Sequence, residues 1–238
     1  MDLKKIVLIV IVIIVLYYII TWLFKGSIQL TTLQNANLKQ TILANTLKNN
    51  SNTSNFAYST WFYVDDWNYR FGEEKILLLR ARRLNDIGFS IVLGAMNNNI
   101  EISVECYKQN AETGILGNNP LIHKCSIENF PLQKWVNLTT SVYGRTLDVY
   151  IDGKLVRTCV LPGVAKVNPD YNITVTPLGG FHGFTGNFQY WSNALNPQEA
   201  YNIYRDGYGG SVLGNLFNRY RIKIAFLEDN KEQASFEI

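Results

Sequence analysis

Two glutamates four positions apart are the first residues in this sequence whose types could carry out chemistry. Glu101, Ser103 and Glu105 alternate with apolar residues, and the period of two that is typical of a β-strand puts all three on one face. Two carboxylates that share a face can act as nucleophile and general acid in glycoside hydrolysis. The alternative is an ordinary strand whose polar face lies in solvent.

The cysteines and histidines do not form a recognisable metal site. The three cysteines, Cys106, Cys125 and Cys159, have no CxxC spacing, and His123 and His182 are isolated. Cys106 and Cys125 bracket a polar loop, so the sequence allows one disulfide between them. The other interpretation is three free thiols, most of them buried.

Aromatic residues are plentiful in this chain. The chain has 14 Tyr, 12 Phe and 5 Trp. A glycan-binding face needs exposed Trp or Tyr, and Trp67 and Tyr69, in the loop after the first core strand, are the candidates. The net charge of +3 is small and scattered, without a basic stripe interleaved with aromatics, which argues against a nucleic-acid partner.

An uncharged apolar run at Ile6–Phe24 predicts a single transmembrane helix. A helix of this length spans about 28 Å, close to the hydrocarbon thickness of a bilayer. Tyr17, Tyr18 and Trp22 lie toward one end, as in an aromatic belt. A cleaved signal peptide fits less well, because the run is long and no A-x-A-like site follows it. We therefore expect a single-pass membrane protein.

The rest of the chain is patterned as short β-strands joined by turns. Asp152-Gly153 predicts a tight hairpin turn. One short helix is expected at Asn196–Tyr204, with Asn196 as N-cap and Pro197 at the first helical position. The expected strands are Ala57–Val64, Lys75–Leu79, Gly88–Leu93, Asn99–Val104, Trp135–Val142, Thr146–Ile151, Lys154–Thr158, Asn172–Thr176 and Gly186–Trp191.

The strand spacing predicts an all-β fold, an antiparallel β-sandwich or jelly roll preceded by one transmembrane helix. The expected divisions are an anchor (1–25), a polar spacer or first edge strand (26–55), the sandwich (56–208) and a C-terminal hairpin extension (209–238).

Four segments in order resemble the concanavalin A-like lectin/glucanase superfamily, in its laminin-G-like branch. They are Tyr58–Val64 (YSTWFYV), Gln133–Val142 (QKWVNLTTSV), Arg145–Val156 (RTLDVYIDGKLV) and Gly183–Tyr204 (GFTGNFQYWSNALNPQEAYNIY). The resemblance implies a fold and no single function, because this fold is used by lectins, glucanases and adhesion modules.

The resemblance also bears on the candidate sites. Glucanases of this superfamily use an E-x-D-x-E strand, and Ser103 stands here where that pattern has Asp, so we expect a protein that is not an enzyme. Laminin-G-like domains often bind one Ca²⁺, which makes Asp65, Asp66 and Asp170, all in loops, the candidate ligands. Solvated turns are the alternative for these residues, and the sequence implies no other cofactor.

The overall organisation is similar to that of membrane-anchored minor capsid or virion membrane proteins of large icosahedral DNA viruses. We expect a non-catalytic structural or interaction protein that links an inner membrane to a capsid shell. Its partners would be the lipid bilayer and neighbouring capsid or membrane proteins. The alternative hypothesis is a membrane-anchored surface lectin that binds glycans.

Overall fold

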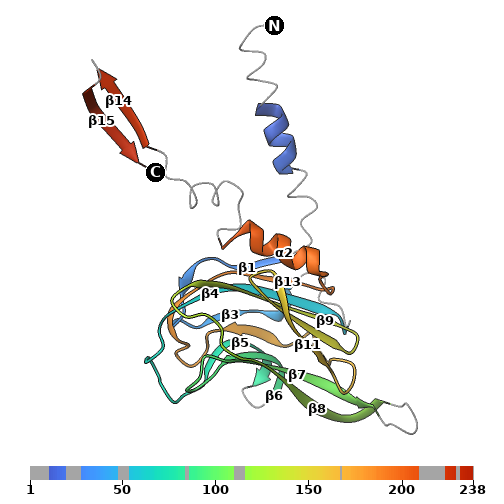
Figure 1. Ribbon diagram of the computed structural model, residues 1–238. Helices are drawn as coiled ribbons and strands as arrows, with labels where there is room; N and C mark the ends of the chain where they lie inside the picture. Colours follow the sequence, from blue (N-terminus) through green and yellow to red (C-terminus); the bar gives the residue numbers. More distant parts are fainter. Residues whose placement is uncertain are drawn as a thin grey trace.

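Two antiparallel sheets packed face to face form the body of the protein in the computed structural model (Figure 1). The structure describes residues 11–19, 28–47, 54–83, 86–109, 116–166, 168–208, 223–228 and 231–237. The expected all-β antiparallel sandwich is confirmed.

Sheet A is the upper layer in Figure 1 and has the order β1-β13-β4-β9-β10-β11, with β2 also paired to β13. Its strands are β1 (Ile28–Thr31), β2 (Gln34–Asn35), β4 (Phe56–Asp66), β9 (Trp135–Tyr143), β10 (Thr146–Ile151), β11 (Lys154–Val160) and β13 (His182–Trp191).

Sheet B, the lower layer, has the order β3-β12-β5-β6-β7-β8. Its strands are β3 (Gln40–Ile42), β5 (Lys75–Arg83), β6 (Asp86–Leu93), β7 (Ile100–Gln109), β8 (Leu116–Ile127) and β12 (Asn172–Val175), and a 3₁₀ turn, η1 (Ala44–Thr46), follows β3. Residues 28–47, within the stretch expected as spacer or edge strand, thus supply an edge strand to each sheet, β1 and β3.

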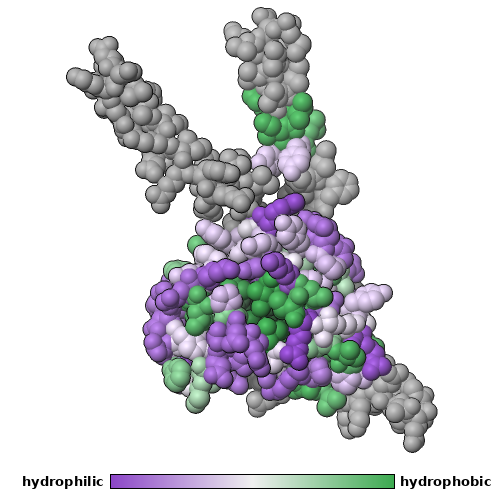
Figure 2. Space-filling model, viewed as in Figure 1, coloured by the Kyte–Doolittle hydropathy of each residue, from purple (hydrophilic) through white to green (hydrophobic). Residues whose placement is uncertain are grey.

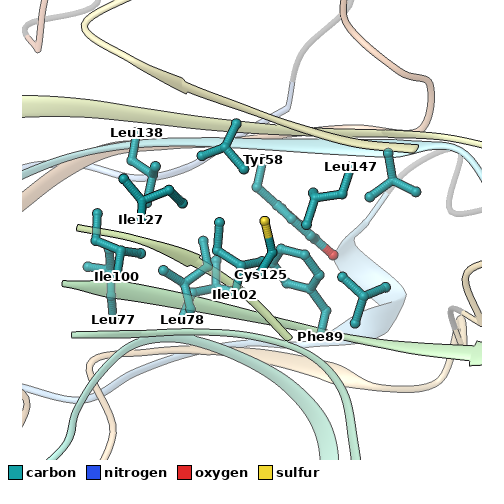
Figure 3. Close-up of a cluster of buried hydrophobic side chains, with 14 of the residues drawn as sticks. Tyr58, Leu77, Leu78, Phe89, Ile100, Ile102, Cys125, Ile127, Leu138 and Leu147 are labelled. Carbon is teal, nitrogen blue, oxygen red and sulfur yellow. The ribbon is translucent and has the colours of Figure 1, made fainter. Parts of the chain in front are cut away.

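The core lies between the sheets and follows the period of two. In β4, Tyr58, Phe62 and Val64 point inward, whereas Trp61 and Tyr63 point to the outer face of sheet A. Figure 3 shows Tyr58, Leu138 and Leu147 of sheet A facing Phe89 and Ile102 of sheet B. This burial of apolar surface from both sheets is the main stabilising term of the sandwich.

The local signals for a turn and a helix act as expected. Asp152 and Gly153 both have positive φ, 50° and 71°, and join β10 to β11 as a type I′ turn does. Helix α2 (Pro197–Asp206) begins after Asn196, whose side chain accepts from the Glu199 backbone N–H while the Glu199 side chain accepts from Asn196 N–H. This capping box fixes the start of the helix that crosses the outer face of sheet A.

The disulfide joins cysteines other than the expected pair. Cys125 of β8 is bonded to Cys159 of β11, so the bond links an edge of sheet B to an edge of sheet A. The prediction of a Cys106–Cys125 bond is wrong, and so is the alternative of three free thiols, since only Cys106 is free and it is buried. Cys125 is paired with Ile102 and not with Cys106 in the β7–β8 register, which separates the two cysteines by about 13 Å, beyond the reach of a disulfide.

The expected anchor lies partly outside the described residues. Residues 11–19 are helical, and their side chains are exposed and largely hydrophobic, in contrast to the mostly hydrophilic sandwich surface (Figure 2). Among the residues that the structure describes, no helix has both the length and the apolar character needed to cross a membrane.

The C-terminal extension contains a hairpin. Strand β14 (Lys223–Glu228) pairs antiparallel with β15 (Lys231–Glu237) in a separate two-stranded sheet.

Candidate functional site

The paired glutamates share the outer face of sheet B, but each is engaged by a lysine. Lys124 Nζ lies 2.7 Å from Glu101 Oε1, and Lys166 Nζ lies 3.2 Å from Glu105 Oε1. Ser103, between them, is buried and supplies a hydroxyl where the glucanase pattern has a carboxylate. Glu101, Ser103 and Glu105 therefore provide two of the three acidic groups of the glucanase pattern, and the central one is missing.

Glu105 is buried, so the alternative of a polar face that lies in solvent does not hold at this position. Residues 163–166 run beside the end of β7, where Val164 O accepts from Tyr107 N–H at 2.9 Å and Glu105 O accepts from Lys166 N–H at 2.7 Å. Only 5% of Glu105 is exposed, and its Oε2 has no hydrogen-bond partner among the residues that the structure describes. The carboxylate is therefore buried and paired with Lys166, and its access to solvent is restricted.

The rim of the sandwich, where residues 66–74 meet residues 176–181, brings several of the predicted site residues together. Tyr69 Oη donates to Gly179 O at 3.2 Å, and Arg70 Nη1 donates to the carbonyls of Leu178 and Gly180. Arg70 is also ion-paired with Glu73. These contacts join two loops that are more than a hundred residues apart in the sequence, and we call the joined loops the rim.

Trp67 packs into the rim and is not a free stacking surface. Its Nε1 donates to Met96 O at 3.0 Å, its ring lies 5.8 Å from that of Phe130, and Lys75 Nζ lies 4.6 Å from its ring centroid. Burial, followed by the positive charge of Arg70, lowers the pKa of Lys75. A face of the indole is thus already occupied by a cation, so Tyr69 is the better placed of the two predicted glycan-binding residues.

Asp65 and His182 form the polar edge of the rim. His182 Nδ1 lies 3.4 Å from Asp65 Oδ2, both side chains are about half exposed, and the Tyr69 ring lies 6.3 Å from the imidazole. Asp66 is exposed, and its Oδ1 accepts from Asn68 N–H. A carboxylate, an imidazole and a phenol are therefore gathered within reach of one small polar ligand.

The third predicted metal ligand is not at this rim. Asp170 precedes β12, whose first residue pairs with Ala81 near the end of β5, whereas Asp65 and Asp66 precede the loop that leads to the start of β5. In the described part of the chain, no three Asp, Glu, His or Cys side chains are arranged to hold a metal ion. The three aspartates are not a single ligand set.

Sequence reasoning missed a continuous row of aromatic side chains on the outer side of sheet A. Successive ring centroids are 4.8 to 6.5 Å apart. Two features of the sequence could have predicted this row. Aromatic residues occupy alternate positions of β4 that point outward, and the later helix α2 is rich in tyrosine. In order, the members of this aromatic row are Phe184, Tyr63, Trp135, Tyr208, Trp61, Tyr204 and Tyr201.

The family model of the laminin G-type concanavalin A-like lectin/glucanases superfamily matches residues 36–200, well over half of the chain. The chain belongs to this superfamily. A domain of this superfamily's laminin-G-like type is suited to binding carbohydrate or protein. No curated protein matches the sequence.

Solved structures with a similar fold include binding domains of botulinum neurotoxins. The receptor binding domain of botulinum neurotoxin C/D mosaic serotype is 15% identical with a TM-score of 0.53, over 77% of this chain and 43% of that chain. The binding domain of botulinum neurotoxin DC, solved in complex with rat synaptotagmin II, is 18% identical with a TM-score of 0.52, over 71% and 40%. At these identities the likeness concerns the fold alone, and this chain spans about two fifths of the length of either structure.

Proposed function

We propose that this chain is a non-catalytic interaction protein that an N-terminal helix tethers to a membrane. The observation that carries the proposal is the short stretch of sequence between the apolar run and the sandwich. Phe24 ends the run and Ile28 begins β1, so four backbone steps, about 14 Å when extended, join them. A binding domain on so short a connection acts at the membrane surface.

The outer face of sheet B supports a role without turnover. Ser103 stands where the glucanase pattern has an acidic residue, Lys124 and Lys166 engage the two glutamates, and Glu105 is buried. The test is hydrolysis of β-glucans by the purified full chain. Turnover that disappears in Glu105→Gln, while the protein stays folded, would contradict the proposal.

The partner that we propose is a neighbouring protein of a capsid shell, with the chain acting as a minor capsid or virion membrane protein. Its organisation supports this, and so does the hairpin of β14 and β15. A two-stranded hairpin is marginally stable alone, and adding its edge to a neighbour's sheet would stabilise it. Cross-linking in a purified particle should join this chain to shell proteins. Recovery only from host membranes, without such cross-links, would contradict this partner.

A surface lectin is the second candidate, and the rim favours it. Tyr69, His182 and Asp65 place a ring and two hydrogen-bonding groups at one exposed edge. The full chain in lipid nanodiscs should then bind a glycan array saturably, and Tyr69→Ala should abolish binding. Tyr143→Ala changes an exposed tyrosine at the far end of β9 and is the matched control. Equal loss in both variants would argue against a site at the rim.

A further inference from the structure

The aromatic row lies on the sheet to which the chain connects its apolar run. Tyr63 and Trp61 of β4, Trp135 of β9 and Phe184 of β13 occupy outward positions of sheet A. Helix α2 supplies Tyr201 and Tyr204, and Tyr208 lies two residues after its end. Figure 1 shows α2 across this outer side of sheet A. The row therefore extends from β13 across the sheet to the helix.

The row is only partly covered by the protein itself. Phe184 is 41% exposed, Tyr201 is also exposed, and Tyr63, Trp135 and Tyr208 are half-buried. The Trp135 and Tyr208 rings stack at 4.8 Å with their planes 7° apart. The exposed parts of these rings, among the residues that the structure describes, are suited to contact with a second surface that has both apolar and polar groups.

Leu33 extends this surface toward the start of the sandwich. It is 57% exposed, its side chain lies beside Gly186 of β13, and β2 next to it pairs Asn35 with Phe184. Lys134, the neighbour of Trp135, is exposed and lies 3.0 Å from Asp152. Tryptophan and tyrosine favour the headgroup level of a bilayer, and a lysine beside them can lay its aliphatic stem along apolar surface while its charged end stays in a polar environment.

The number of residues between the apolar run and the aromatic row limits how far the row can lie from the end of that run. Leu33 follows Phe24 by nine residues, a span of at most about 31 Å. β1 lies between these two residues and β2 directly follows Leu33, and both strands are paired with β13, the strand that carries Phe184. If the apolar run spans a bilayer, the row lies within this distance of the headgroups of that bilayer.

We propose that the aromatic row and Leu33 form a bilayer-contact surface that rests in the headgroup layer of the membrane to which the chain is tethered. The inference rests on the proposed tether. It fixes the orientation of the sandwich, with sheet A toward the lipid and sheet B away from it. The outer face of sheet B then remains available to a partner.

Spin labels on the full chain test this orientation. The chain, with Cys106→Ser to remove its free thiol, is reconstituted in vesicles of phosphatidylcholine and phosphatidylserine and carries one label at Phe184→Cys. The matched control is a label at Met96→Cys, an exposed position between β6 and β7 of sheet B. We expect collisions with a water-soluble nickel chelate to fall several-fold at position 184 on transfer from detergent to vesicles, and to stay unchanged at position 96.

Two results would overturn the inference. One is an equally high accessibility of both labels in vesicles. The other is protection of position 184 that persists in detergent, which would mean that protein, not lipid, covers the row. Extraction of the vesicles with alkali tests the tether separately. A chain that alkali removes contradicts the proposed tether, whereas a chain that stays inserted with an accessible Phe184 label contradicts only the bilayer contact.

Discussion

The guanidinium of Arg80 donates a hydrogen bond from Nη1 to the hydroxyl of Tyr58 at 2.9 Å, across the space between the two sheets. Both residues are almost completely buried. Arg80 Nη2 also donates to Asn168 O at 3.3 Å, and the Tyr190 ring lies 5.8 Å from the guanidinium carbon. A charged group thus ties β5 of sheet B to β4 and β13 of sheet A inside an otherwise apolar core.

Removing the Tyr58 hydroxyl should destabilise the sandwich, because it takes one acceptor from a buried charge. Tyr58→Phe should lower the free energy of unfolding by about 1.5–3 kcal/mol, the usual range for a hydrogen bond to a charged group. Urea unfolding monitored by tryptophan fluorescence measures this. Tyr143→Phe, at an exposed position, should change nothing. If Tyr58→Phe lowers the free energy of unfolding no more than the control does, the hydrogen bond between Arg80 and Tyr58 does not contribute to stability.

The disulfide between Cys125 and Cys159 should contribute more to the free energy of unfolding than the hydrogen bond between Arg80 and Tyr58. Cys125 and Cys159 are 34 residues apart, and closing a loop of that size in the unfolded chain stabilises the folded state by about 3–4 kcal/mol in the chain-entropy account. Cys125→Ser/Cys159→Ser should lower the unfolding midpoint in urea accordingly, and reductant should then have no further effect. An unfolding midpoint equal to that of the unsubstituted chain would refute this assignment.

The Cys106 thiol should be unreactive in the folded protein. Burial raises its pKa to about 11, so that at pH 8 only about 0.1% of it is thiolate. Alkylation should modify almost no thiol in the folded chain and one thiol per chain in denaturant, with the disulfide intact. Rapid modification of the folded chain would contradict the burial of this residue.

The same shift should make stability depend on pH. The folded state holds the Cys106 proton more tightly than the unfolded state, so this contribution is complete below about pH 9 and is lost as the pH rises toward about 11. Cys106→Ala should flatten the fall in the unfolding midpoint over this window.

Gly180 should be irreplaceable because of its neighbours and not only because of its backbone angle. Its φ is +43°, and a Cβ there would lie 1.9 Å from Ala36 O. Gly72 also has positive φ, +85°, but a Cβ added to it would have no atom within 4 Å. Gly180→Ala should therefore lower the melting temperature clearly more than Gly72→Ala. Equal losses would show that the backbone angle alone accounts for the effect.

Local signals predicted much of the fold. The Asp152-Gly153 turn, the Asn196 cap and the alternation in β4 and β7 act through residues that are near in sequence, so they can be read without the fold. Strand β8 was missed because Asn118, Asn119 and Pro120 look like a turn. Proline is tolerated there because β8 is an edge strand, which sequence alone does not show.

The candidate sites were harder to predict because they depend on distant segments. The partner of Cys125 became visible only when β8 and β11 lay side by side as edges of opposite sheets. The partners of Arg80, Tyr58 and Asn168, come from segments that are distant in the sequence, so nothing near Arg80 indicates its burial. Trp67 looked like a binding residue because nothing near it in sequence shows that Lys75 and Phe130 cover it.

The bond between Cys125 and Cys159 also decides how the chain would respond to mechanical load. A pull through the residues before Ile28 enters sheet A at β1, and the bond closes the sandwich at β11, the opposite edge of that sheet. β9, β10 and most of β11 lie inside the covalent loop, so force on the chain ends cannot extend them. The bond therefore keeps the 34 residues of the loop from extending. A fully stretched molecule with the bond intact would be about 110 Å shorter in contour length than one in which the bond is reduced.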